Sequence, residues 1–212
     1  MYVISFQDLF YYKEVVVDLT QVKLEKKGDS VLAEKFEQMS VKIIWTTEND
    51  FDLAAFIELK KVEGQEQMPM FLYFADDSKG DLNNFPFMKL SEDAGQGDTV
   101  DTTAAGAINE EELIIAKIDP TIEKIHILAW DYPMVEKSNK ARFKDSDIRT
   151  EMIDNNNKSY AVTLDTGDFA NACVMATIEC GGITPKIVNK STSSVMKGFD
   201  NLQQIYDLCH KA

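Results

Sequence analysis

The chain has 212 residues, 44% of them hydrophobic, and its 36 acidic and 22 basic side chains give a formal net charge of −14. Nucleic acid and anionic membrane surfaces are bound through Lys and Arg, so this charge argues against both as partners. It favours cations and basic proteins, although an acidic surface also serves solubility alone.

Cysteine usage and the start of the chain indicate the compartment. The three cysteines, Cys173, Cys180 and Cys209, form an odd, sparse set that is typical of reduced thiols. No apolar run is long enough to cross a bilayer. The first residues lack the basic segment of a secretory signal. The sequence therefore predicts a cytoplasmic protein that does not insert into a membrane.

Short apolar runs rich in β-branched residues, separated by turn residues, predict strands along most of the chain. In chain order the runs lie at residues 15–19, 22–24, 40–46, 52–61, 70–74, 113–118, 124–130, 160–164, 172–179 and 183–188. Gly28-Asp29 predicts a turn, and Gly181-Gly182 predicts a hairpin, because paired glycines allow the positive φ of a primed turn. Many short strands with such turns indicate an antiparallel β-sandwich.

One α-helix is predicted at the end of the chain. Its apolar residues recur at helical spacing: Phe199, Leu202, Ile205, Tyr206 and Cys209. Ser193 or Ser194 is the expected N-cap. We expect the apolar side of this helix to pack on the sandwich, which gives a mostly β fold with a C-terminal α-helix.

The acidic residues are unevenly spread. No basic residue lies between Lys89 and Lys117. That stretch contains the carboxylates of Glu92, Asp93, Asp98, Asp101, Glu110, Glu111 and Glu112. Asp50 and Asp52 would share one face of a strand, and Asp76 begins a further acidic pair. Calcium takes about six to eight oxygen ligands, so these clusters are candidate calcium ligands. Solvated charged faces have the same composition, so composition alone leaves both interpretations open.

A series of short motifs occurs in order between Val22 and Leu208. The motifs are Gly28-Asp29-Ser30-Val31, the strand Val41–Trp45, Asp50-Phe51-Asp52, Phe71-Leu72-Tyr73-Phe74, Gly95-Gln96-Gly97-Asp98, Asn109-Glu110-Glu111-Glu112, Ile122–Ile127 and Gly198-Phe199. No single motif is specific. The ordered series resembles the TerD-type tellurium-resistance family.

The resemblance implies a β-sandwich that holds calcium in acidic loops at one end, a link to tellurite and other stress responses, and no defined catalytic activity. Carried over residue by residue, it implies calcium ligands at Asp50, Asp52, Asp76, Asp98, Glu110, Glu111 and Glu112. It covers residues 22–212 as one domain and leaves residues 1–21 as an N-terminal extension. The aromatic cluster of that extension either docks on a partner or adds a strand at the sandwich edge.

Two departures from the family pattern leave an alternative open. The segment before Gly95 is degraded, and residues 99–108 separate Asp98 from the three glutamates. The alternative is a scaffold or interaction subunit of a larger assembly that kept the fold and lost or weakened the metal site. A related eukaryotic branch is described as binding cyclic nucleotides, but an acidic surface repels a phosphodiester.

Enzymatic function finds little support in the sequence. Neither a nucleophile elbow nor a phosphate-binding loop motif occurs. His126 lies within an apolar run and is expected to be a hydrogen-bonded core histidine. Cys173 has no basic activator nearby in the sequence, and Trp45 and Trp130 lie in core strands. The sequence predicts a non-enzymatic protein whose partners are calcium and other proteins.

Overall fold

Thirteen strands in the described part of the chain form two facing sheets. The computed structural model describes residues 21–64, 67–92, 108–140, 143–199 and 201–211. The seven-stranded sheet has the order β1 (Val22–Leu24), β11 (Ser159–Thr163), β10 (Arg149–Asp154), β3 (Met39–Trp45), β8 (Asn109–Ile115), β7 (Met88–Leu90) and β6 (Gly80–Asp81). The six-stranded sheet has the order β2 (Ser30–Leu32), β13 (Lys186–Ser194), β12 (Ala172–Glu179), β9 (Ile122–Asp131), β4 (Phe51–Leu59) and β5 (Met70–Leu72). The predicted β-sandwich is confirmed.

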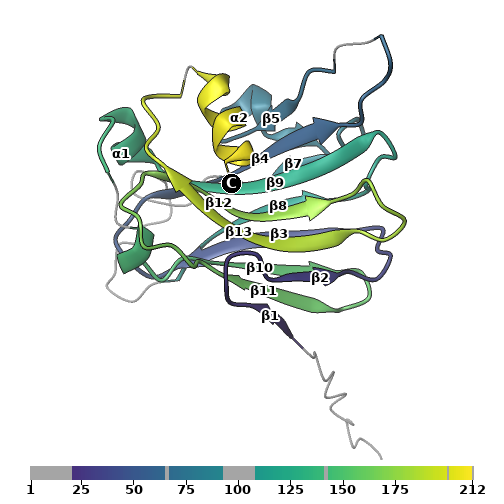
Figure 1. The fold of residues 1–212 in the computed structure, drawn as a ribbon, viewed down its shortest axis with the longest axis horizontal. Coiled ribbons are helices and arrows are strands. Elements are labelled where there is room, and N and C mark those ends of the chain that lie inside the picture. The colour runs from purple at the N-terminus through teal and green to yellow at the C-terminus, as the bar shows by residue number, and fades with distance from the viewer. Residues whose placement is uncertain (1–20, 65–66, 93–107, 141–142, 200, 212) are drawn as a thin grey trace, which may run out of the picture.

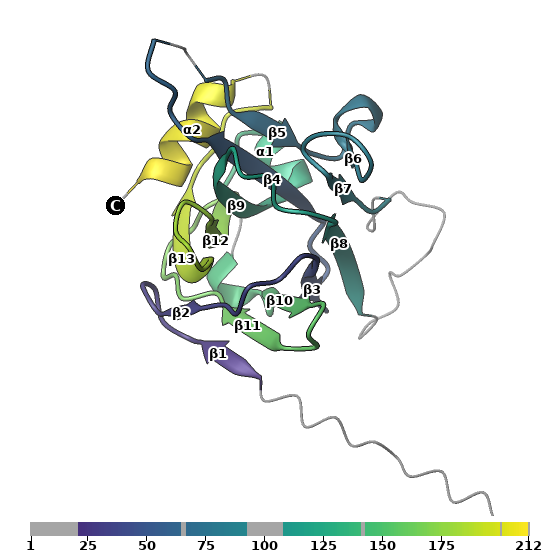
Figure 2. The ribbon, with the colours of Figure 1, turned by 90° about the vertical axis from the view of Figure 1, so that its right-hand side faces the viewer.

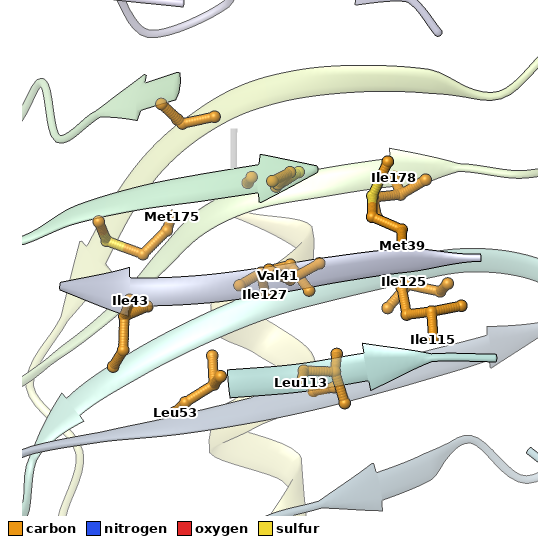
Figure 3. Packing of buried hydrophobic residues seen from close by; sticks show 14 of the residues in the cluster. Met39, Val41, Ile43, Leu53, Leu113, Ile115, Ile125, Ile127, Met175 and Ile178 are labelled. Atoms are coloured by element: carbon orange, nitrogen blue, oxygen red, sulfur yellow. The ribbon is translucent and has the colours of Figure 1, made fainter. Parts of the chain in front are cut away.

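The main core fills the space between the two sheets. Side chains alternate across each strand, so Val41 and Ile43 of β3 point inward together with Leu113 of β8. They pack against inward side chains of the opposite sheet, such as Ile127 of β9 and Met175 of β12. Figure 3 shows these side chains meeting between the strands. The sandwich is therefore held by apolar burial from strands far apart in the sequence.

A second apolar layer lies on the outer face of the six-stranded sheet. Helix α2 (Leu202–His210) lies outside that sheet, as Figures 1 and 2 show. Its buried side chains Ile205, Leu208 and Cys209 pack with Phe56 and Trp130 of the sheet. The predicted packing of the helix on the sandwich is confirmed. No helix in the described part of the chain has the length and apolar character needed to cross a membrane.

The structure corrects several local predictions. Gly181 and Gly182 lie between β12 and β13, but neither has a positive φ, and the connection is six residues long instead of a two-residue primed turn. The N-cap of α2 is Asn201, whose side chain accepts the N–H of Gln203 at 3.0 Å. Ser193 and Ser194 instead end strand β13.

Several elements of the structure were not predicted from the sequence. Strands β2, β6, β7 and β10 were not predicted, nor were the short helices α1 (Tyr132–Glu136), η1 (Asp76–Ser78) and η2 (Phe143–Asp145). The three glutamates 110–112 were assigned to a loop, but they lie inside strand β8. The predicted strand at residues 15–19 and residues 1–20 of the predicted N-terminal extension 1–21 lie outside the described residues.

Candidate functional site

The candidate calcium ligands were expected at one end of the sandwich, which we call the acidic end. At this end β3 and β9 finish, and β4 and β8 begin. Trp45, the last residue of β3, pairs with Asn109, the first residue of β8, and Phe51 of β4 pairs with Asp131 of β9. Asp50 lies just before β4, at the acidic end. Asp98 lies outside the described residues. Asp76 begins η1, and its side chain is also outside the description.

Asp52 is buried on the outer face of the six-stranded sheet. It is the cross-strand partner of Trp130, so both side chains lie on the same face. The Trp130 Nε1–H donates to Asp52 Oδ2 at 2.8 Å, and only 3% of Asp52 is exposed. A buried indole N–H needs such an acceptor. Asp52 therefore serves as the acceptor beneath the second apolar layer.

The three consecutive glutamates divide between the two faces of β8. Glu111 points inward, and its Oε2 accepts the Leu53 N–H at 2.6 Å, which ties β8 to β4 of the opposite sheet. Glu110 and Glu112 point outward. Glu110 pairs with Lys42 at 2.8 Å, and Glu112 accepts the Ser40 hydroxyl at 2.5 Å. The hydrogen bond from Lys42 to Glu110 raises the pKa of that lysine.

These contacts test whether the predicted ligands form a calcium site. Calcium needs several oxygens converging on one point. Asp52 and Glu111 each accept a protein N–H, and Glu110 and Glu112 lie on the other face of β8. Within the described ranges, no group of three or more His, Cys, Asp or Glu residues is placed to hold a metal. Asp52 and Glu111 therefore already act as hydrogen-bond acceptors within the fold, and calcium binding stays a prediction.

Two polar residues at the acidic end were not singled out from the sequence. Asp131 caps α1, accepting the Met134 N–H at 3.3 Å and the Asn49 side-chain N–H at 2.8 Å. Burial raises the pKa of the Asp131 carboxyl. Asp147 accepts both the N–H and the hydroxyl of Thr46. The acidic end is thus held by carboxylates that accept hydrogen bonds across the loops.

Asn171 links three segments beside this end. Its fully buried side chain donates to the carbonyls of Met134 (3.3 Å), Asn139 (2.8 Å) and Met196 (2.9 Å), and its Oδ1 accepts the Met196 N–H at 2.7 Å. One amide thereby fixes the segment after α1 and the segment after β13. The sequence offered one signal for this role, because Asn171 is a polar residue directly before the apolar run 172–179.

Comparisons with known proteins find similar folds only among solved structures. A crystallised homologue of the telluride resistance protein TerD from Streptomyces coelicolor A3(2) matches with a TM-score of 0.47 and 12% identity, over 79% of this chain and 92% of that one. The chain is similar in fold to that TerD homologue. A crystallised protein of unknown function matches with a TM-score of 0.45 and 12% identity, over 78% of this chain and 99% of that one. No protein-family model and no curated protein matches the sequence.

His126 and the three cysteines are buried. His126 is a hydrogen-bonded core residue, as predicted, with Thr177 at 2.8 Å and Glu58 at 2.5 Å. This Thr–His–Glu arrangement is closed to substrate because Thr177 and His126 are both buried. Burial also raises the pKa of all three thiols, that of Cys180 to about 12.

Proposed function

We propose that this chain is a non-enzymatic β-sandwich module that binds a partner protein through an aromatic surface beside α2. The proposal rests on one observation, a cluster of partly exposed rings on the outer face of the six-stranded sheet. We call it the aromatic face. It consists of the rings of Phe71, Tyr73, Phe74, Tyr132 and Phe199, together with Leu202 and Tyr206, which are exposed on α2.

The rings of the aromatic face hold one another in place. Tyr132 stacks on Phe199 with 5.1 Å between ring centroids, and Phe74 meets both edge-on at 5.3 and 5.7 Å. On α2, Leu202 and Tyr206 lie one turn apart and are 54% and 43% exposed. Fixed aromatic side chains bury a large area at low entropic cost, and Tyr and Phe are enriched at protein interfaces. The surface therefore suits a protein partner.

Charge indicates the chemistry of that partner. The net charge of −14 favours a basic protein. Exposed carboxylates stand close in sequence to the aromatic face, at Asp77 of η1, Glu136 of α1 and Asp207 of α2. Arg and Lys side chains would pair with these carboxylates and lie over the rings. The partner is therefore expected to present basic residues around an apolar centre.

Serine substitutions in the aromatic face test the proposal. In native extract, we expect the 23.9 kDa wild-type chain to elute in a larger complex that salt weakens. The Leu202→Ser, Tyr206→Ser double variant should elute as the free chain, because it loses two exposed anchors. The measurement is size-exclusion chromatography of the tagged chain.

A matched double variant controls for loss of apolar surface in general. Leu32 and Ile183 are 64% and 100% exposed, and they lie at β2 and at the β12–β13 connection, the opposite end of the sheet. Their serine variants should keep the complex. Elution of the wild type as free chain, or a complex that survives in the Leu202 and Tyr206 variant, contradicts the proposal.

Calcium binding at the acidic end is a second candidate, favoured by a different observation. Two buried oxygens there, Asn109 Oδ1 and Thr47 Oγ1, have no hydrogen-bond partner among the described residues. Asn109 lies on the same face of β8 as Glu111, and its register partner Trp45 is two residues from Thr47. Such oxygens suit a calcium ion or an ordered water. If the first proposal holds, ordered water binds these two oxygens. Titration with calcium distinguishes water from a calcium ion at this position.

A further inference from the structure

Strand β13 has an edge that its neighbour β2 covers only in part. The two strands pair over residues 186–188, whereas β13 continues to Ser194, as Figure 1 shows. The chain segment around Gly28-Asp29 still bonds to the backbone of Asn189, and it then turns away to β1. Among the described residues, no strand pairs with this side of β13 beyond that point. The segment 190–194 is therefore an open sheet edge.

Strand alternation sets the direction of the backbone groups along this edge. The Ser194 carbonyl accepts the Asn171 N–H at 3.2 Å, so it faces β12. Successive residues of a strand turn their backbone groups to opposite sides. The N–H and the carbonyl of Ser193 therefore face the open side. In agreement with this direction, the Ser193 carbonyl accepts an N–H of Lys211 Nζ at 2.8 Å.

An open groove runs along this edge and consists of two adjoining spaces of about 450 Å³ each. Both spaces are lined by Ser194 and Lys211. The first lies beside the loop that holds Phe169, and Lys140 also lines it. The second lies beside α2, where Leu208 lines it. We call these two spaces the β13 groove. Their size is in the range of ligand-binding sites, roughly 300–1,000 Å³.

The β13 groove and the aromatic face lie on different sides of α2. Gln204, Leu208 and Lys211 line the groove and recur at helical spacing. Leu202 and Tyr206, the exposed residues of the aromatic face, project from the other side of the helix. A partner bound at the aromatic face leaves the groove accessible. The groove is therefore a second surface, and it does not depend on the partner-binding proposal.

The charged side chains of the groove differ from those of the whole chain. Lys140 and Lys211 are exposed and line it. Its carboxylates are Asp168, which accepts the Ser193 hydroxyl at 3.3 Å, and Asp207, which accepts a side-chain N–H from within α2 at 2.7 Å. Lysines thus equal carboxylates in number here, whereas the whole chain has 36 acidic and 22 basic residues.

The hydrogen-bond donors of the groove favour an anionic ligand. An ammonium group has three N–H bonds. Lys211 donates one of them to Ser193 and keeps two for a ligand. The two groove carboxylates already accept hydrogen bonds from the chain itself. The groove therefore offers charged donors beside an open strand edge, a combination that suits a peptide with acidic side chains.

We propose that the β13 groove binds an extended acidic peptide, which adds a strand beside Ser193. The peptide main chain exchanges hydrogen bonds with the N–H and the carbonyl of Ser193, because that carbonyl has a second lone pair beyond its bond to Lys211. Acidic side chains of the peptide pair with Lys140 and Lys211. Apolar side chains lie against the ring of Phe169, which is 45% exposed.

Fluorescence anisotropy with the full chain tests the proposal. The probe is a labelled hexapeptide of alternating valine and glutamate, for which we expect saturable binding. The Lys140→Gln, Lys211→Gln double variant should bind it roughly three- to tenfold more weakly, because two ion pairs are lost. The Lys35→Gln, Lys61→Gln variant makes the same change in net charge at two exposed lysines outside the groove. It should bind as the wild type does.

Two further peptides separate strand addition from attraction between charges. A hexapeptide of alternating valine and lysine should not bind. The valine–glutamate peptide with every backbone nitrogen methylated keeps its charges but has no N–H to donate. It should lose saturable binding.

Three results overturn the proposal. They are no saturable binding of the acidic peptide up to millimolar concentration, equal binding by the Lys140 and Lys211 variant, and equal binding of the methylated peptide. The first and third results come from the wild-type chain, so they hold even if the variants fold poorly.

Discussion

Replacing Asn171 by Leu should lower the free energy of unfolding by about 3 kcal/mol, because the buried carbonyl and N–H of Met196 and two partly buried carbonyls lose their partner. Leucine has a similar size, so the loss reflects hydrogen bonding more than a cavity. Urea denaturation followed by tryptophan fluorescence measures the effect. The same substitution at exposed Asn83 should leave the unfolding midpoint close to that of the wild type.

The Asn171 variant also bears on the aromatic face. Helix α1 begins at Tyr132. The Asn171 amide joins the segment after this helix to the segment that leads to Phe199. These two rings stack on each other. Loss of the amide should therefore loosen the stack as well as lower stability. A wild-type midpoint for Asn171→Leu would show that water replaces the amide and that its structural role is minor.

Asp52→Ala should lower the free energy of unfolding by about 2 kcal/mol, because the buried Trp130 N–H loses its acceptor. Asp52→Asn should retain most of the stability, since the amide oxygen still accepts from the indole. Thermal unfolding of both variants in the presence of a chelator measures the difference. If Asn destabilises as much as Ala, the negative charge of Asp52 is required, and its role as a hydrogen-bond acceptor is insufficient.

Apolar periodicity predicted the strands with strong β-branched runs, such as β3, β9 and β12, because their side chains fill the core directly. Strand β10 was not predicted because only one of its three buried residues, Met152, is apolar, while its other large apolar residue, Ile153, is exposed. Three consecutive glutamates indicated a loop, yet β8 extends through them. Pairing with β3 brings Lys42 to Glu110 and Ser40 to Glu112, each as a diagonal neighbour on the outward face.

The candidate site was harder to predict because its contacts are tertiary. Glu111 meets Leu53 across 58 positions and Asn49 meets Asp131 across 82. Local spacing correctly placed Asp52 on a strand, but it gave no sign that Trp130 occupies one of its oxygens. Strand alternation then sends Glu110 and Glu111 to opposite faces, although they are neighbours in sequence.

Calorimetric titration of the full chain with calcium tests most directly whether the acidic end serves the fold or a metal. The carboxylates of Asp52, Glu110, Glu111 and Glu112 already bind Trp130, Lys42, Leu53 and Ser40, respectively. We therefore expect no saturable heat up to millimolar calcium. Saturable binding that the Glu111→Gln variant abolishes would contradict the account and assign the acidic end to calcium.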